Sequence, residues 1–114
     1  MKDKKLVDRC TQLFQDGLGE NIKVLDMREV SSVADYFIIV SGNSVPHLDA
    51  LGDRLHRTLK EEGTNVFRKS GTPVSGWMIF DYFDVVVHIM NEEMRNRYDL
   101  ESLWGDAPIL AVAS

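Results

Sequence analysis

Residues 76–90 constrain the fold more than any other stretch, because their pattern is typical of a β-hairpin. Apolar and β-branched residues dominate both halves, and the polar break falls at residues 82–84. A second stretch, residues 36–40, is apolar at every position. A strand without alternation is buried on both faces, so this stretch predicts a central strand of a sheet.

Helical periodicity and capping residues predict the other elements. Apolar residues recur at helical spacing in residues 3–16, and Gly17 stands where a left-handed cap would end that helix. Between Ser44, a good N-cap, and Gly63, leucines at steps of three and four predict a second helix. Two further strands are predicted at residues 22–27 and 65–68, and a loop is predicted at residues 69–75. Two short helices are predicted to begin after Asn91 and Asp99.

Together these elements predict an α/β fold, with helices packed on a mixed sheet of about five strands. The strand at 36–40, the second helix and the strand at 65–68 form a predicted βαβ unit with a parallel, right-handed crossover. Residues 109–114 are apolar but few, and we expect this tail to fray or to pack against a partner.

Length and composition predict the broad class. The 114 residues suit a single domain, 1–114, that buries a core without metal or disulfide staples. The single cysteine, Cys10, cannot form an intrachain disulfide, and on the apolar side of its helix we expect an inert, buried thiol. No apolar run reaches the roughly 18 residues that cross a bilayer, and none follows the charged N-terminus as a secretory signal would. We therefore expect a soluble cytoplasmic protein that does not bind membranes.

The charge is unevenly distributed along the chain. Residues 76–114 carry two basic and seven acidic side chains, which accounts for the whole net charge of −5. A field of one sign speeds the encounter with an oppositely charged partner and repels nucleic-acid phosphates. The pattern therefore favours a basic protein partner over direct nucleic-acid recognition, although an acidic face that only keeps the protein soluble explains the same count.

The turn at residues 41–44 is one candidate for chemistry. A Gly-Ser turn before a helix can hold a phosphate, and nucleotidyltransferases add metal-binding acids on the next strand. Residues 65–69 contain no acid, and the chain has no Walker lysine and no GxGxxG motif. A helix that is simply capped by Ser44 is the favoured interpretation, and a nucleotide-binding or residual nucleotidyltransferase site at Ser41–Ser44 is the alternative.

Asp81, Asp84 and His88 are a second candidate, as metal ligands. A hairpin turn splays its side chains, and the other histidines lie on a different predicted helix. We therefore predict no metal and no cofactor, with His88 half-buried and held by a hydrogen bond. The chain also lacks the motifs of a nucleophilic hydrolase.

A protein-binding face is the third candidate. Exposed tryptophan and tyrosine anchor protein interfaces, and Trp77, Tyr82, Tyr98 and Trp104 all fall in the acidic third of the chain. A core position is the alternative for both tryptophans; it suits Trp104, whereas Trp77 at a strand start favours an interface. A binding module is therefore favoured over an enzyme.

Two motifs resemble the signatures of the ribosomal silencing factor (Iojap-like) family. Residues 35–44 with His47 resemble the first; residues 76–88 with Arg95 and residues 98–108 resemble the second. The resemblance implies a nucleotidyltransferase-like fold without transferase activity. It also implies binding to the large ribosomal subunit through the fourteenth large-subunit ribosomal protein, which blocks joining of the small subunit and lowers translation when nutrients are short. A homodimer in the free state is implied as well.

The family resemblance also implies the contact residues. The positions carried over to this chain are Trp77, Met78, Asp81, Tyr82, Asp84, His88 and Tyr98. Phe83 departs from the family, which usually has glycine at this turn. Glycine adopts a positive φ readily and phenylalanine does so at a cost, so the geometry of this turn, and with it the direction of Asp84, is where the chain is expected to differ from its relatives.

Overall fold

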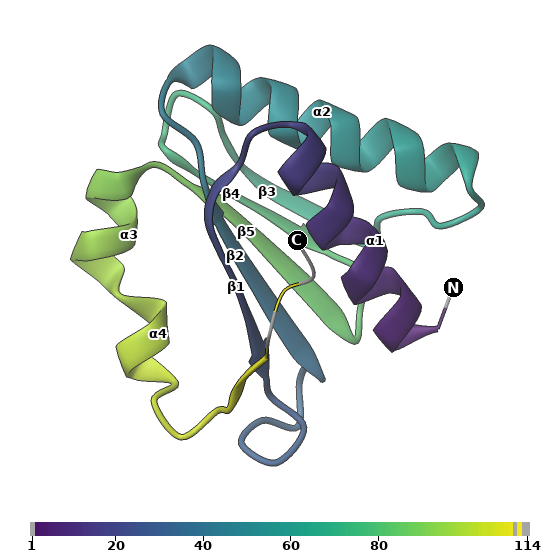
Figure 1. Cartoon of the computed structure of the whole chain (residues 1–114), viewed down its shortest axis with the longest axis vertical. Coiled ribbons are helices and arrows are strands. Elements are labelled where there is room, and N and C mark those ends of the chain that lie inside the picture. The colour runs from purple at the N-terminus through teal and green to yellow at the C-terminus, as the bar shows by residue number, and fades with distance from the viewer. Residues whose placement is uncertain (1, 111, 113–114) are drawn as a thin grey trace.

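The computed structural model describes residues 2–110 and 112, which form a mixed sheet with helices on both faces (Figure 1). The elements in chain order are α1 (Asp3–Asp16), β1 (Glu20–Asp26), β2 (Tyr36–Ser41), α2 (Val45–Glu61), β3 (Arg68–Thr72), β4 (Trp77–Asp81), β5 (Val85–Met90), α3 (Glu92–Tyr98), α4 (Leu100–Leu103) and β6 (Ile109–Leu110). The strand order is β3-β4-β5-β2-β1-β6, in which β2 and β5 are parallel and the other neighbours are antiparallel. The predicted α/β class and the β4–β5 hairpin are confirmed.

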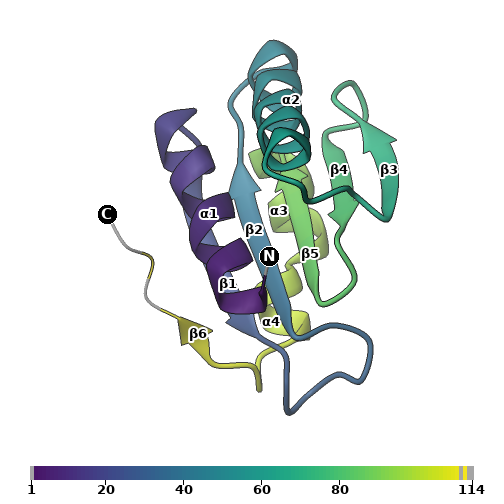
Figure 2. The same cartoon turned by 90° about the vertical axis from the view of Figure 1, so that its right-hand side faces the viewer.

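Different helices cover the two faces of the sheet. Helices α1 and α2 lie on one face, and α3 and α4 lie on the other (Figure 2). Because successive strand residues point to opposite faces, β4 and β5 contribute to two cores. Phe80 and Val87 pack on the α1–α2 side, whereas Met90 packs with Leu100 on the α3–α4 side. Strand β2 is buried at all positions but Phe37, as predicted for a central strand.

The predicted strand at residues 65–68 is wrong. The strand begins at Arg68 and extends to Thr72, through most of the predicted loop. All five of its residues are exposed, because β3 is an edge strand that pairs with β4. Such a strand has no buried face, so it lacks the apolar alternation that a sequence pattern detects.

The predicted βαβ unit is only partly correct. The connection from β2 through α2 leads to a strand parallel to β2, but β4 and β5 lie between β2 and β3. The parallel neighbour of β2 is β5, in the register Tyr36↔Val85 to Ser41↔Met90. The β4–β5 hairpin therefore lies between β3 and β2 in the sheet.

The sheet also has six strands rather than five. Ile109 and Leu110 pair with Leu25 and Val24 of β1, so these two tail residues are not frayed. Residues 111, 113 and 114 lie outside the described part of the chain.

The end of α1 differs from its prediction in one respect. Gly17 is the C-cap, but its φ is −87°, and Leu18 takes the positive φ of 61°. A Cβ on Gly17 would lie 2.9 Å from Cδ2 of Leu51. The glycine therefore serves the close approach of α1 to α2 rather than a left-handed cap.

The predicted N-caps are confirmed. The backbone N–H of His47 donates to Ser44 Oγ (3.1 Å), and that of Met94 donates to Asn91 Oδ1 (2.8 Å). Asp99, with φ of 43°, separates α3 from α4. No helix in the described ranges combines the length and apolar character needed to cross a bilayer.

Candidate protein-binding face

Trp77 stands at the start of β4 on the side of the sheet that faces α3 and α4. Strand alternation places it with Asp81 on that side, and both are half-buried. The indole Nε1–H donates to Nδ1 of His88 on β5 at 3.1 Å, and the ring packs on Tyr98 with centroids 4.9 Å apart. Trp77 is thus fixed in orientation while part of its ring stays accessible.

His88 supports Trp77 from within the sheet. It is 6% exposed and lies at the centre of β5, so it is more deeply buried than predicted. Since Nδ1 accepts the indole hydrogen bond, the ring proton resides on Nε2, which has no partner among the described residues. Burial lowers the pKa of His88 to about 4, so the imidazole is neutral at physiological pH.

Three half-buried or exposed rings, those of Tyr98, Phe37 and Trp104, continue from this pair across the sheet. Phe37 of β2 contacts His88 (5.0 Å between centroids) and meets Trp104 edge-on at 6.0 Å. We call the surface formed by Trp77, Tyr98, Phe37 and Trp104 the aromatic face. Tyr98 is 48% exposed and Leu103 on α4 is 68% exposed, whereas the two tryptophans also pack against the core. The tryptophans therefore serve both core and surface.

Met78 and Tyr82 do not belong to this face. They are 6% and 7% exposed, and they point into the core beneath α1 and α2. Burial raises the pKa of the Tyr82 hydroxyl, whose oxygen has no partner among the described residues. The family positions carried over to Met78, Tyr82 and His88 therefore have no freely accessible side chain, because strand pairing and helix packing enclose them. Cys10 lies in the same core, fully buried, and burial raises its pKa to about 12, as expected for an inert thiol.

The hairpin turn places Phe83 in the left-handed region that favours glycine. Phe83 has φ of 73° and is 60% exposed. Two contacts offset the strain: its N–H donates to Asp81 Oδ1 at 2.8 Å, and its ring packs on Phe67 with centroids 4.0 Å apart. Asp81 is therefore partly occupied in holding the turn.

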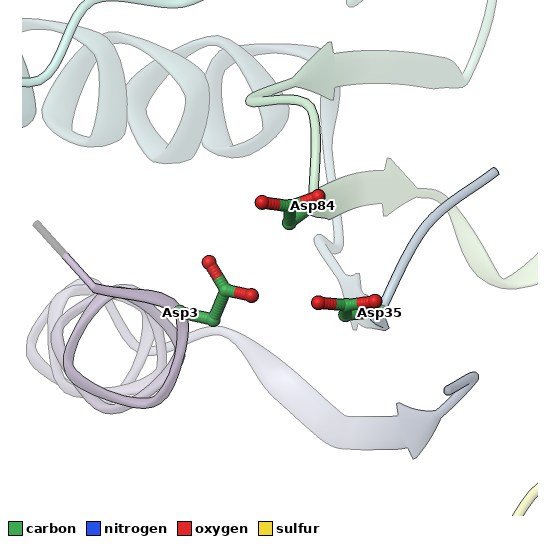
Figure 3. Close-up of side chains that lie close together, drawn as sticks. All are labelled: Asp3, Asp35 and Asp84. Atoms are coloured by element: carbon green, nitrogen blue, oxygen red, sulfur yellow. The ribbon is translucent and has the colours of Figure 1, made fainter. Parts of the chain in front are cut away.

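Asp84 lies away from Asp81 and His88, among other carboxylates. It comes within 4.8 Å of Asp3 on α1 and Asp35 before β2, and Figure 3 shows the three side chains converging. Desolvation, a hydrogen bond with Asp35 and the charge of Asp84 raise the pKa of Asp3. A proton on Asp3 lowers the repulsion among the three carboxylates, which is why its pKa is raised.

A polar crevice opens at the carboxyl ends of β2 and β5. It has a volume of about 390 Å³ and is lined by Ser41, Gly42, Asn43 and residues of α3. The crevice includes most of the predicted nucleotide-binding turn. Its wall also carries Glu20, Glu92 and Asp99, whose charges repel phosphate.

Sequence reasoning missed Phe37 and Arg95 as parts of these sites. Phe37 lies in a uniformly apolar strand, whose pattern does not distinguish it from its buried neighbours. Arg95 is 4% exposed and bonds Glu101 and Ser41. A charged side chain in a short helix after a buried strand offers no signal of such burial.

Comparison with known proteins assigns the chain to a family. A family model described as "Ribosomal silencing factor during starvation" matches residues 1–114. The chain belongs to the ribosomal silencing factor family. The Bacillus subtilis protein named ribosomal silencing factor RsfS is 37% identical over 109 residues, which make up 96% of this chain and 92% of that protein. The resemblance found in the two sequence motifs is therefore confirmed.

A solved structure and a mouse protein are also similar to this chain. A crystal structure of a Chromobacterium violaceum protein has a TM-score of 0.88 and 29% identity, and the match covers 100% of this chain and 94% of that one. A mouse protein named mitochondrial assembly of ribosomal large subunit protein 1 is 29% identical over 101 residues, or 86% of this chain and 44% of that protein. The names of the family and of its Bacillus subtilis member describe silencing factors rather than enzymes.

Proposed function

We propose that this protein represses translation by binding the large ribosomal subunit through its fourteenth ribosomal protein, with the aromatic face as the contact surface. The supporting observation is the row of rings from Tyr98 through Trp77 and His88 to Phe37, which presents accessible aromatic area on a rigid sheet. Aromatic anchors of this kind dominate the binding energy of protein interfaces. The name of the mouse relative, which refers to the ribosomal large subunit, supports this choice of partner.

In this proposal the protein acts by steric exclusion and catalyses no reaction. Trp77 and Tyr98 provide the anchors, and Asp81 on the same side of the sheet steers the face towards a basic protein. Asp84, which lies beside Asp3 of α1, contributes only to the overall negative charge. Met78, Tyr82 and His88 support the strands from inside. Once bound, the domain blocks joining of the small subunit, mainly when nutrients are limiting.

The remaining expectations from the family resemblance belong to the same proposal. Residues 1–114 act as one cytoplasmic domain with a nucleotidyltransferase-like fold and no catalytic role, cofactor or metal. The free protein is a homodimer, and it recognises neither nucleic acid nor membranes directly.

The experiment compares two exposed aromatic rings in co-sedimentation with purified large subunits. Tyr98 on the aromatic face is 48% exposed, and Phe67 at the far end of the hairpin is 50% exposed. We expect Tyr98→Ala to weaken binding about tenfold and Trp77→Ala to weaken it by about 2 kcal/mol or more, whereas Phe67→Ala leaves it unchanged. Unchanged binding by both Tyr98→Ala and Trp77→Ala would show that the contact surface lies elsewhere.

Addition of the wild-type protein to a mixture of subunits tests the second half of the proposal. We expect joined ribosomes to decrease in a sucrose gradient and free subunits to increase to match. If the protein binds large subunits while joining proceeds normally, the steric mechanism is wrong even though the partner is right.

The alternative is a nucleotide-binding or residual nucleotidyltransferase domain that uses Ser41–Ser44. The crevice beside Ser41, Gly42 and Asn43 favours it, and the acids in the crevice oppose it. Calorimetric titration with ATP and GTP in the presence of Mg²⁺ separates the two functions. We expect no binding isotherm, and a clear one would support the alternative.

A further inference from the structure

The crevice lies where open α/β sheets generally bind ligands. Strands β2 and β5 are the parallel pair of the sheet, and their carboxyl ends meet at Ser41 and Met90. The chain leaves β2 towards α2 on one face and leaves β5 towards α3 on the other (Figure 2). Adjacent parallel strands that part in this way open a crevice outside their carboxyl ends. The volume of about 390 Å³ is sufficient for a small metabolite.

The inner wall of the crevice holds an incompletely bonded guanidinium. Arg95 lines the crevice and is 4% exposed. Its Nε donates to Glu101 Oε1 at 3.1 Å and its Nη1 donates to Ser41 Oγ at 2.9 Å. Its buried Nη2 has no partner among the described residues. Buried donors are nearly always satisfied in folded proteins, so this nitrogen indicates an acceptor that the chain itself does not supply.

The rim of the crevice has the opposite charge. Glu20, Glu92 and Asp99 line it and are exposed, whereas the carboxylate that neutralises Arg95 is that of Glu101. Among the described residues that line the crevice, the only cation, Arg95, is already paired with Glu101, and the three rim carboxylates would repel a phosphate group. A polyamine suits the rim but offers no acceptor to Arg95. A ligand that satisfies both regions carries an acceptor at one end and a cation at the other.

We propose that this crevice binds a free α-amino acid, with its carboxylate on Arg95 and its ammonium group against the rim acids. Guanidinium and carboxylate form the strong, charge-assisted hydrogen bonds that a buried site requires. The amides of Asn21, Asn43 and Asn96 also line the crevice and suit a polar side chain on the ligand. The proposal is independent of ribosome binding, because the crevice and the aromatic face are formed by different side chains.

The test is a ¹H–¹⁵N NMR titration of the full chain with each of the twenty amino acids in turn. For the amino acids that bind, we expect shifts at the amides of Gly42, Asn43 and Asn96. We expect no binding by the N-acetyl or the carboxamide derivative of the same amino acid, since each lacks one of the two charges. Spermidine and ATP serve as probes for the competing ligand classes. Saturable shifts with either of them but with no amino acid, or no shift with any amino acid, would overturn the proposal.

Two neighbouring glutamates provide a matched pair of variants. Glu92 and Glu93 both lie in the first turn of α3 and both are exposed, but Glu92 lines the crevice and Glu93 pairs with Arg97. We expect Glu92→Gln to weaken amino-acid binding about tenfold and Glu93→Gln to leave it unchanged. Equal affinities in the two variants would contradict the site. The ¹H–¹⁵N spectra of both variants without ligand, expected to match that of the wild type away from the substituted residue, show that the chain is folded.

Discussion

The two faces of the sheet divide stability from recognition. On the α1–α2 side, two long amphipathic helices bury nearly every side chain that β4 and β5 direct towards them. On the α3–α4 side, two short helices cover only part of the sheet and leave Tyr98 and Leu103 exposed. One alternating strand therefore contributes Phe80 to a closed core and Trp77 to an open surface. The comparison shows that incomplete coverage by helices, rather than any special backbone, creates the candidate binding face.

The largest expected effect tests the closed side. Leu55 of α2 is fully buried, whereas Leu103 of α4 is 68% exposed. We expect Leu55→Ala to lower the free energy of unfolding by about 2–5 kcal/mol, because it leaves a cavity in a packed core. Leu103→Ala changes it by less than about 0.5 kcal/mol. Urea denaturation of both variants measures the contrast, and similar losses would contradict the division between the faces.

A pH dependence tests how the open side is held. The pKa of His88 is lowered to about 4 in the fold, against 6.5 for an ordinary histidine. The unfolded state therefore takes up a proton first, and stability is full above pH 6.5 and falls as the pH decreases to about 4. We expect a loss of up to about 3 kcal/mol from this group, measured as the unfolding free energy between pH 7.5 and 4.

His88→Asn is the control for that measurement, since asparagine keeps an acceptor for the Trp77 indole but does not titrate. The difference in unfolding free energy between wild type and variant should shrink as the pH falls. A difference that is constant over this range would show that His88 is not protonated on unfolding.

The turn at the end of the hairpin lies between the two faces and gives a smaller effect. Phe67 packs on Phe83, whose positive φ it helps to offset. We expect Phe67→Ala to lower stability by about 1 kcal/mol in the wild type. In a Phe83→Gly background the same change should have almost no effect, because the ring contact is gone and glycine adopts the turn freely. Equal losses in the two backgrounds would show that the ring pair does not support the turn.

The smallest effect concerns Asp84 beside Asp3 and Asp35. The raised pKa of Asp3 means that the folded state binds this proton more tightly than the unfolded state does. The associated stability is present at low pH and is lost as the pH rises through the folded pKa. Asp84→Asn removes one of the repelling charges, so we expect a gain of about 0.5 kcal/mol or less at pH 7, measured by urea denaturation. A loss would indicate that Asp84 stabilises the fold by another contact.

Local patterns in the sequence predict much of this molecule and miss some of it. The apolar run at residues 36–40 and the hairpin were identified because burial on both faces and a turn leave clear signals. Ser44 and Asn91 were identified as caps because capping depends on residues three positions apart. Strand β3 was misplaced because its exposed residues carry no such signal. The sixth strand was missed because two residues are too few to form a pattern.

Local sequence patterns specify the class of fold, the central strand, the hairpin and the family, because each depends on neighbours along the chain. The accessibility of individual side chains depends instead on tertiary packing. Met78 and Trp77 are adjacent in sequence, yet one is enclosed beneath α2 and the other pairs with His88 on the open side. The carboxylates of Asp84 and Asp3 lie close together, and Arg95 donates a hydrogen bond to Ser41, although each pair is more than 50 residues apart in the chain. Such contacts depend on how the strands are ordered and which helices cover them, and no local pattern specifies that.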